Sequence, residues 1–173
     1  MPDAAALLEA NRAFYAALES RDHSDMEERW SHGDDVTCTH PGWHRLDGWD
    51  DVSRSWKAIF ANSRPWKVRP DEEHPFLSGD IGVVLCVEIL QPIGGEGDPA
   101  RMQATNVFRL EEGRWRMIHH HASAMPDIGD DDEEDPVNQR RSQSLSGLAS
   151  LAIGTTCRWA PRPTRGRHPP NPL

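Results

Sequence analysis

The chain has 173 residues, a length that suits a single domain, and carries a formal net charge of -9. Residues 1–125 hold 13 Lys and Arg against 21 Asp and Glu, and no basic cluster alternates with aromatic residues, so nucleic acid is not an expected partner. No stretch approaches the roughly 20 apolar residues of a membrane span, and no membrane partner is expected either.

The first part of the chain carries two helical patterns. Apolar residues recur at helical spacing from Asp3 to about Ser20, and Asp3 is placed to cap this helix. Asp22 or Ser24 can cap a short second helix that carries Met26 and Trp30. These patterns predict two consecutive helices.

A short strand, a loop and a third helix are predicted next. Val36 to Thr39 is rich in β-prone residues and ends at His40-Pro41, and Gly42 to Gly48 is typical of a loop. One face of a third helix is then marked by Trp49, Val52, Trp56, Ile59 and Phe60. We expect this helix to cover the core.

Four stretches rich in β-branched and aromatic residues follow, separated by turn signals. They are Trp66 to Arg69, Ile81 to Leu90, Met102 to Leu110 and Trp115 to Ser123. Helices followed by strands are typical of an α+β fold, in which helices cover one face of a curved sheet. We therefore expect an antiparallel sheet whose concave face forms a pocket.

The composition changes after Pro126. An acidic run from Asp130 to Asp135 leads into Ser-rich and then Arg- and Pro-rich sequence. Such a stretch cannot repay the entropy of ordering. The sequence predicts a folded domain at residues 1–126 and a disordered tail at 127–173, in which the acidic run is a solvated spacer or an interaction tail.

The three cysteines and the N-terminus bear on location. Cys38, Cys86 and Cys157 form an odd set without a C-x-x-C pair, and two of them lie in apolar, strand-like stretches. The N-terminus lacks the basic start and apolar run of a signal peptide. We expect a reducing, cytoplasmic setting.

Three stretches resemble the SnoaL-like, or nuclear transport factor 2-like, superfamily: Phe14 to Asp22, Thr39 to Trp49, and Asn106 to Ser123. The last of them also resembles the calcium/calmodulin-dependent protein kinase II association domain. The resemblance implies a cone of three helices wrapped by a strongly curved sheet. It further implies an interior pocket for a small, largely apolar molecule and homodimers formed through the outer sheet face.

The resemblance also suggests two catalytic candidates. In ketosteroid isomerase-like members an acid–base carboxylate stands immediately before a proline at the end of the first strand, where this chain has His40. A protonated acid on their penultimate strand polarises the substrate carbonyl, and that position falls on Asn106. A neutral imidazole can act as a base and an amide can donate to an oxyanion. Alternatively, His40 only binds backbone at the strand end.

One feature departs from that pattern. The tyrosine of those enzymes falls on Phe14, and Tyr15 lies one residue further, rotated by about 100° around the helix. This departure counts against an isomerase mechanism. The mechanism that the resemblance implies needs no cofactor.

Alternation along the last strand divides its residues between two faces. Ile118, His120 and Ala122 share one face, and the other holds Trp115, Met117, His119, His121 and Ser123. The resemblance favours the face of His120 as the concave one, although a slip of one residue would reverse this. Only His119 and His121 could share an ion, so no metal site is predicted.

The residues expected to contact the ligand are aromatic or lie on the concave face. They are Phe14, Tyr15, Trp30, Trp43, Trp56, Phe108, Ile118 and His120. Trp43 belongs to the loop after His40-Pro41, where its side chain could close the pocket or dock on the surface of the domain.

Two functions remain open at this point. The first is a cofactor-independent isomerase, cyclase or hydrolase that acts on a carbonyl compound with His40 as base and Asn106 as donor. The second is a non-catalytic ligand-binding or dimerisation module, which is favoured by the displaced tyrosine and by the lack of a carboxylate in the predicted polar set.

Overall fold

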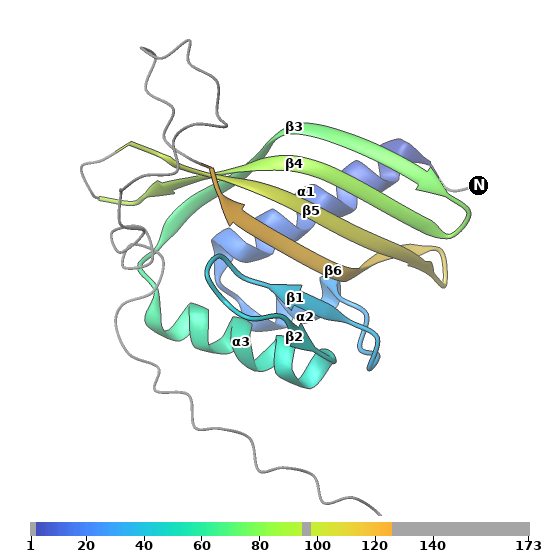
Figure 1. Cartoon of the computed structure of the whole chain (residues 1–173), viewed down its shortest axis with the longest axis horizontal. Coiled ribbons are helices and arrows are strands. Elements are labelled where there is room, and N and C mark those ends of the chain that lie inside the picture. Colours follow the sequence, from blue (N-terminus) through green and yellow to red (C-terminus); the bar gives the residue numbers. More distant parts are fainter. Residues whose placement is uncertain (1–2, 95–97, 126–173) are drawn as a thin grey trace, which may run out of the picture.

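The computed structural model describes residues 3–94 and 98–125, and the predicted tail at 127–173 lies outside this part. Within it the helices are α1 (Ala4–Ser20), α2 (His23–Arg29) and α3 (Trp49–Asn62). The strands are β1 (Thr37–Thr39), β2 (Leu46–Asp47), β3 (Trp66–Ser78), β4 (Ile81–Pro92), β5 (Ala100–Glu111) and β6 (Arg114–Ala124). Figure 1 shows α1 behind the long strands and α3 below them.

The helix boundaries follow the predicted capping residues. The Asp3 side chain accepts a hydrogen bond from the Ala5 N–H, and Asp22 accepts one from the Ser24 N–H. Each bond satisfies a backbone donor that the first helical turn leaves unpaired. Helix α1 ends at Arg21, whose φ of 59° is left-handed. The predictions of all three helices are confirmed.

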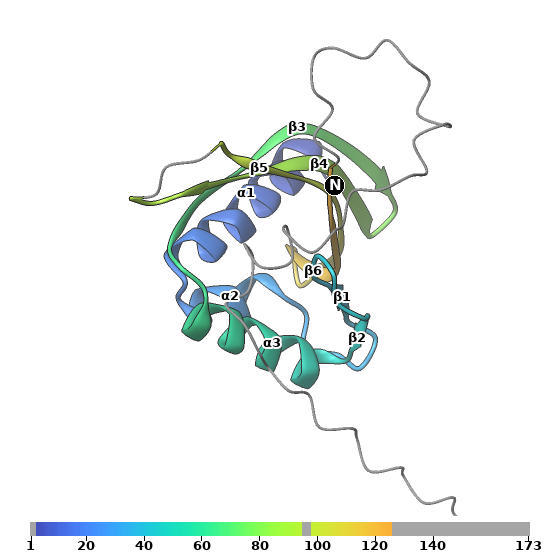
Figure 2. The same ribbon diagram turned by 60° about the vertical axis from the view of Figure 1, so that its left-hand side comes forward.

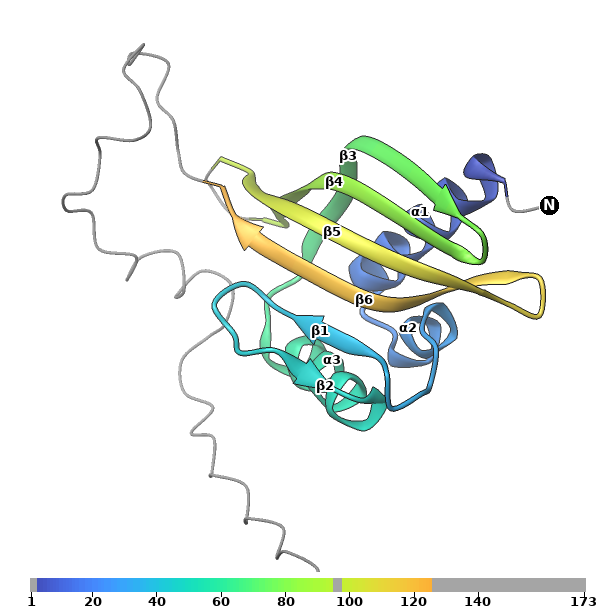
Figure 3. The same ribbon diagram turned by 45° about the vertical axis from the view of Figure 1, so that its right-hand side comes forward.

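The sheet is mixed rather than wholly antiparallel as predicted. Its strand order is β2-β1-β6-β5-β4-β3, and β1 runs parallel to β6, with Cys38 opposite His120. Figure 3 shows the short strands β1 and β2 beside β6. A parallel pairing needs a long connection, here residues 40–113. The order of the strands in the sequence therefore does not reveal that β1 pairs with β6.

The sheet curls around α1, and this curvature forms the cone (Figure 2). Helix α1 packs tightly against β4 at Gly82, where an added Cβ would lie 2.7 Å from Leu7 Cδ1 and 3.2 Å from the Trp115 ring. The fold is the predicted α+β cone of three helices and a strongly curved sheet. None of the described helices is long and apolar enough to cross a bilayer.

Two irregularities in the sheet decide which side chains point inward. In β6 the register against β5 shifts so that Val107 pairs with His119 but Phe108 pairs with Met117, which leaves Ile118 as an extra residue. In β3 the register shifts between Asp71 and His74. A bulge reverses the alternation on one side of it and turns nearby side chains in a new direction.

Candidate functional site

The register of three long strands brings polar side chains together inside the cone. Asn106 on β5 lies opposite Val84 on β4 and His120 on β6, and Glu88 is on the same face of β4 as Val84. Asn106 is fully buried, His120 is 2% exposed and Glu88 is 4% exposed. Because few polar side chains are buried without partners, we expect each of these three to form hydrogen bonds.

Helix α1 supplies the other half of this polar group. Asn11 and Tyr15 are four residues apart, so they share a helix face, and both are buried. Phe14 is also buried, and its ring packs edge-on against Tyr15 with centroids 5.0 Å apart. Because the sheet curls around α1, adjacent residues of this helix both reach the interior.

A continuous set of hydrogen bonds links these side chains. His120 Nδ1 is 2.7 Å from Asn106 Oδ1, and Asn106 Nδ2 donates to Asn11 Oδ1 at 2.8 Å and to Tyr15 Oη at 3.0 Å. Tyr15 in turn donates to Glu88 Oε1 at 3.0 Å. His120 Nε2 lies 3.7 Å from the same carboxyl oxygen, which closes the loop.

The carboxyl group of Glu88 is the acid of this network whose pKa lies near neutral pH. Burial raises its pKa to about 7, while the hydrogen bond from Tyr15 opposes that rise. Burial and the neighbouring Glu88 also raise the pKa of Tyr15, and burial raises the pKa of the Cys86 thiol to about 11. Near neutral pH, therefore, Glu88 exchanges its proton while Tyr15 and Cys86 keep theirs.

Both interior histidines are held neutral. Burial lowers the pKa of His120 well below its usual value, and nearby histidines contribute in the same direction. Burial lowers the pKa of His40 to about 4. Ser55 Oγ donates to the Val52 carbonyl, so it accepts from His40 Nε2 at 2.8 Å, and the lone pair of His40 is left on Nδ1.

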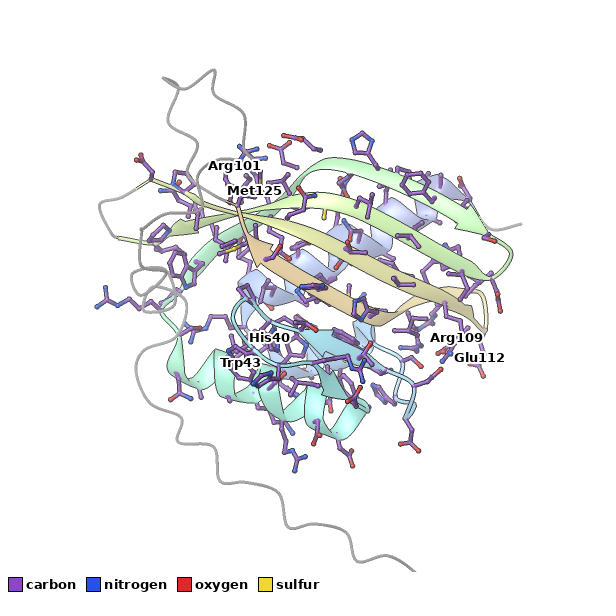
Figure 4. The ribbon with its side chains drawn as sticks, in the orientation of Figure 1. His40, Trp43, Arg101, Arg109, Glu112 and Met125 are labelled. Carbon is purple, nitrogen blue, oxygen red and sulfur yellow. The ribbon has the colours of Figure 1, made fainter. Side chains whose placement is uncertain are left out.

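Aromatic rings enclose the two histidines. Trp56 lies 4.6 Å from His40 and 6.0 Å from His120, measured between ring centroids. Trp43 packs edge-on against His40 at 5.0 Å, and Figure 4 shows the two side chains together in the loop after β1. Trp43 therefore covers His40 from the outer side. The Trp56 indole N–H is buried and has no acceptor among the described residues.

The two predicted catalytic residues do not meet directly. His40 binds Ser55 on α3, whereas Asn106 binds Asn11, Tyr15 and His120. His120 lies between them, since its ring centroid is 6.5 Å from that of His40. The residue that bridges the two candidates was predicted to contact the ligand.

Three sequence interpretations are corrected by this geometry. Tyr15 does reach the interior, so its displacement by one residue does not remove a tyrosine from the site. A carboxylate is present as well, in Glu88. The sequence feature that points to Glu88 is its place as a single acidic residue within the apolar run from Ile81 to Leu90. Sequence reasoning also missed Asn11 and Ser55, which have no local pattern that distinguishes them.

The third correction concerns the last strand. Ile118 is the bulged residue and is only partly buried, whereas Trp115 and Met117, predicted to face outward, are buried with His120 and Ala122. The alternation is therefore correct after the bulge and reversed before it. Trp30 and Phe108 are fully packed members of the apolar core.

Two surface hollows lie away from this interior group. One of about 500 Å³ lies between the helices and the β5–β6 hairpin, and includes Ala10, Arg29 and Arg114. The other, about 490 Å³, adjoins Leu77 and Leu110. Neither contains a predicted site residue. Among residues 3–94 and 98–125 no three His, Cys, Asp or Glu side chains are grouped to hold a metal ion.

Comparison with known families identifies the fold group. The SnoaL-like domain family matches residues 7–127, which is more than half of the chain. The chain belongs to the SnoaL-like domain family. A proposed dehydratase of the NTF2-like family from Streptomyces avermitilis is 33% identical, with a TM-score of 0.66, covering 72% of this chain and 96% of its own.

Two further relatives have different contexts. A proposed calcium/calmodulin-dependent protein kinase type II association domain from Thiobacillus denitrificans is 36% identical, with a TM-score of 0.63, over 68% of this chain and 93% of its own. The F-box protein SKIP8 of Arabidopsis thaliana is 28% identical over 120 residues, which are 69% of this SnoaL-like chain. The chain spans about half the length of that relative.

The raised pKa of Glu88 predicts a pH-dependent effect of Glu88→Gln on stability. An unfolded Glu titrates near pH 4.3, so between about pH 4.3 and 7 the unfolded chain loses a proton that the folded one keeps, and this lowers the wild-type free energy of unfolding as pH rises. The glutamine of the variant does not titrate. Relative to wild type, the variant should gain about 3 kcal/mol between pH 4 and pH 7.5.

Urea unfolding at several pH values measures this difference. The opposite pH dependence of His40, whose lowered pKa favours folding as pH rises from about 4 to 6.5, is present in both proteins and cancels. Glu112→Gln changes an exposed carboxylate at the β5–β6 hairpin and serves as the control (Figure 4). A stability difference that stays constant across this pH range would contradict the raised pKa.

Proposed function

We propose that the cone interior is an acid–base site that acts on a small neutral carbonyl compound, either eliminating water from it or shifting its double bond. The observation that carries this proposal is the buried pair of Glu88 and His120, whose facing atoms are 3.7 Å apart. Near neutral pH the carboxyl group holds a proton that it can release, and the imidazole is free to accept one.

The pair can complete an elimination without any net loss of protons. His120 takes the proton next to the carbonyl, the carbon–oxygen bond of the β-hydroxyl breaks as the double bond forms, and Glu88 protonates the departing hydroxide to give water. His120 then carries an extra proton and Glu88 is ionised. Because Glu88 has the higher pKa, the proton returns from His120 to Glu88 across the 3.7 Å gap.

The absence of buried cations among the described residues favours a neutral substrate. Among the described residues no Lys or Arg is buried, so an anionic ligand would find no cation inside the cone. The rings of Phe14, Trp56 and the two histidines pack around the pair, and they would give a bound molecule an apolar surrounding. His40, with its lone pair on Nδ1, is a second candidate base. The similarity to a proposed dehydratase supports this reaction class.

Loss of either member of the pair should abolish most of the turnover. 3-Hydroxycyclohexanone and 3-cyclohexenone test elimination and isomerisation together, because both give the same conjugated ketone, whose ultraviolet absorption is easily followed. Glu88→Gln and His120→Gln should each lower kcat/KM by about 10²- to 10⁴-fold, the usual contribution of a general acid or base. His121→Gln, an exposed neighbour on the opposite face, is the matched control. Full turnover in both Glu88→Gln and His120→Gln would remove this mechanism.

The Trp56 indole provides a second test, because an unpaired buried donor is expected to bind a ligand oxygen. Trp30 is an equally buried tryptophan whose Nε1 donates to Met26 Sδ at 3.3 Å. Trp56→Phe should therefore lower kcat/KM about tenfold. Trp30→Phe should lower the free energy of unfolding by about 1 kcal/mol more than Trp56→Phe does, because only Trp30 loses a hydrogen bond inside the protein. Equal effects of the two variants on both turnover and urea unfolding would refute a donor role for Trp56.

A second candidate function is assembly through the outer sheet face. Phe76, Val83 and Val107 lie opposite one another across β3, β4 and β5, next to Leu85. Phe76 is 57% exposed and Leu85 is 37% exposed, so the row presents apolar surface to solvent. Relatives named as an association domain and as a hub share this fold. We propose that two copies pair through this row.

Introducing a charge into the row should separate the copies. Leu85→Lys is expected to convert a dimer at micromolar concentration into a monomer, because a buried unpaired charge opposes association. Light scattering during gel filtration measures the mass. Leu77→Lys is the control, since Leu77 is similarly exposed but lies opposite Gly82, which faces α1 rather than the outer face. A wild-type monomer at this concentration, or an unchanged Leu85→Lys dimer, would argue against this interface.

A further inference from the structure

The bulge in β3 turns one carboxylate toward the interior network. Glu72 has a left-handed φ of 51°, and the register of β3 against β4 shifts at this point. The next residue, Glu73, has a side chain that is only 10% exposed. Its Oε2 accepts from Arg12 Nε at 2.8 Å, and its Oε1 accepts from Asn11 Nδ2 at 2.9 Å. Bulges commonly redirect a side chain in this way.

Glu73 stands at the end of a chain of groups whose directions depend on one another. A carboxylate can only accept hydrogen bonds, so the Asn11 amide must turn its NH2 toward Glu73 and its oxygen toward Asn106. That oxygen requires the NH2 of Asn106, which leaves Asn106 Oδ1 facing His120. An amide oxygen also only accepts, so His120 must carry its proton on Nδ1.

The same order fixes the other branch of the network. With its NH2 donating to Tyr15 Oη, Asn106 makes the tyrosine oxygen an acceptor, and the phenolic proton is directed to Glu88 Oε1. His120 Nε2 is then the nitrogen without a proton, and it faces the same carboxyl group. The lone pair and the acid of the proposed reaction thus both depend on the orientation of the two amides.

The reverse arrangement is possible in every link except the first. If both amides turned over, Asn106 would donate to His120 Nδ1, the imidazole proton would move to Nε2, and Tyr15 would donate to Asn106 instead of Glu88. Asn11 Oδ1 would then face Glu73 Oε1 at hydrogen-bond distance, with two acceptors opposed and no proton between them. Buried polar atoms left in that state are costly, so the carboxylate excludes this arrangement.

We propose that Glu73 is a positioning residue that fixes the proton of His120 on Nδ1 through the amides of Asn11 and Asn106. Glu73 contacts neither His120 nor Glu88 directly, and its effect passes through two side chains that themselves carry no charge. The importance of this effect for turnover rests on the proposed function, but the position of the proton does not, so each can fail without the other.

Nitrogen-15 spectra of histidine-labelled full-length protein at pH 6, where Glu88 still holds its proton, measure the position of the His120 proton, because protonated and unprotonated ring nitrogens have widely separated shifts. The chain has nine histidines, and the His120 signal is identified by its absence in His120→Gln. Wild type should show His120 with its proton on Nδ1. In Glu73→Gln the Nε2–H form should rise from under about 10% to about half, because a Gln side chain can either donate or accept.

Matched variants separate this effect from loss of charge or of packing. Glu72→Gln removes the adjacent carboxylate, which binds Arg101 on the surface, and Arg12→Gln removes the ion-pair partner but keeps the Glu73 carboxylate. Both should retain Nδ1–H. Asn11→Leu breaks the chain midway and should also mix the two forms, which provides a second test if Glu73→Gln does not fold. A folded Glu73→Gln or Asn11→Leu with His120 still only in the Nδ1–H form would overturn the proposal, as would a wild type with Nε2–H.

Discussion

Glu88 lies inside the cone, on the concave face of β4, without a buried Lys or Arg among the described residues to neutralise it. An ionised carboxylate in that position would be costly, so the group holds its proton up to about pH 7 and takes a hydrogen bond from Tyr15. Tyr15 in turn needs Asn106, and Asn106 needs both Asn11 and His120. The polar interior therefore follows from the requirement to accommodate one buried acid.

The same burial moves the two titrating partners in opposite directions. It disfavours the charged form of each, which raises the pKa of a carboxyl group and lowers that of an imidazole. Below about pH 7 the pair consequently rests with a proton on Glu88, while His120 stays neutral. Environments that move the pKa values of an acid and a base apart in this manner are typical of catalytic sites.

The sequence predicted the features that depend on local patterns and missed those set by distant contacts. The helix caps at Asp3 and Asp22 could be predicted, because each cap bonds a residue only two positions further along the chain. The parallel pairing of Cys38 with His120 joins residues far apart in the chain, so no local pattern predicts it. The bulge at Ile118 has no local sequence signal either. Glu88 was overlooked because its neighbours predict a buried apolar strand, and only the packed interior shows that an acid fits there.

The two residues that connect Glu73 to His120 are amides and not carboxylates. Asn11 and Asn106 each present a donor at one end and an acceptor at the other, so they pass on the direction of a hydrogen bond without passing on a charge or a proton. A carboxylate in place of the Asn106 amide would compete with Glu88 for protons, so the two groups would titrate together and neither alone would be the acid. With amides, the site keeps a single exchangeable proton between Glu88 and His120, while the carboxylate of Glu73, held by Arg12 at the edge of the cone, fixes the direction of the hydrogen bonds that lead to them.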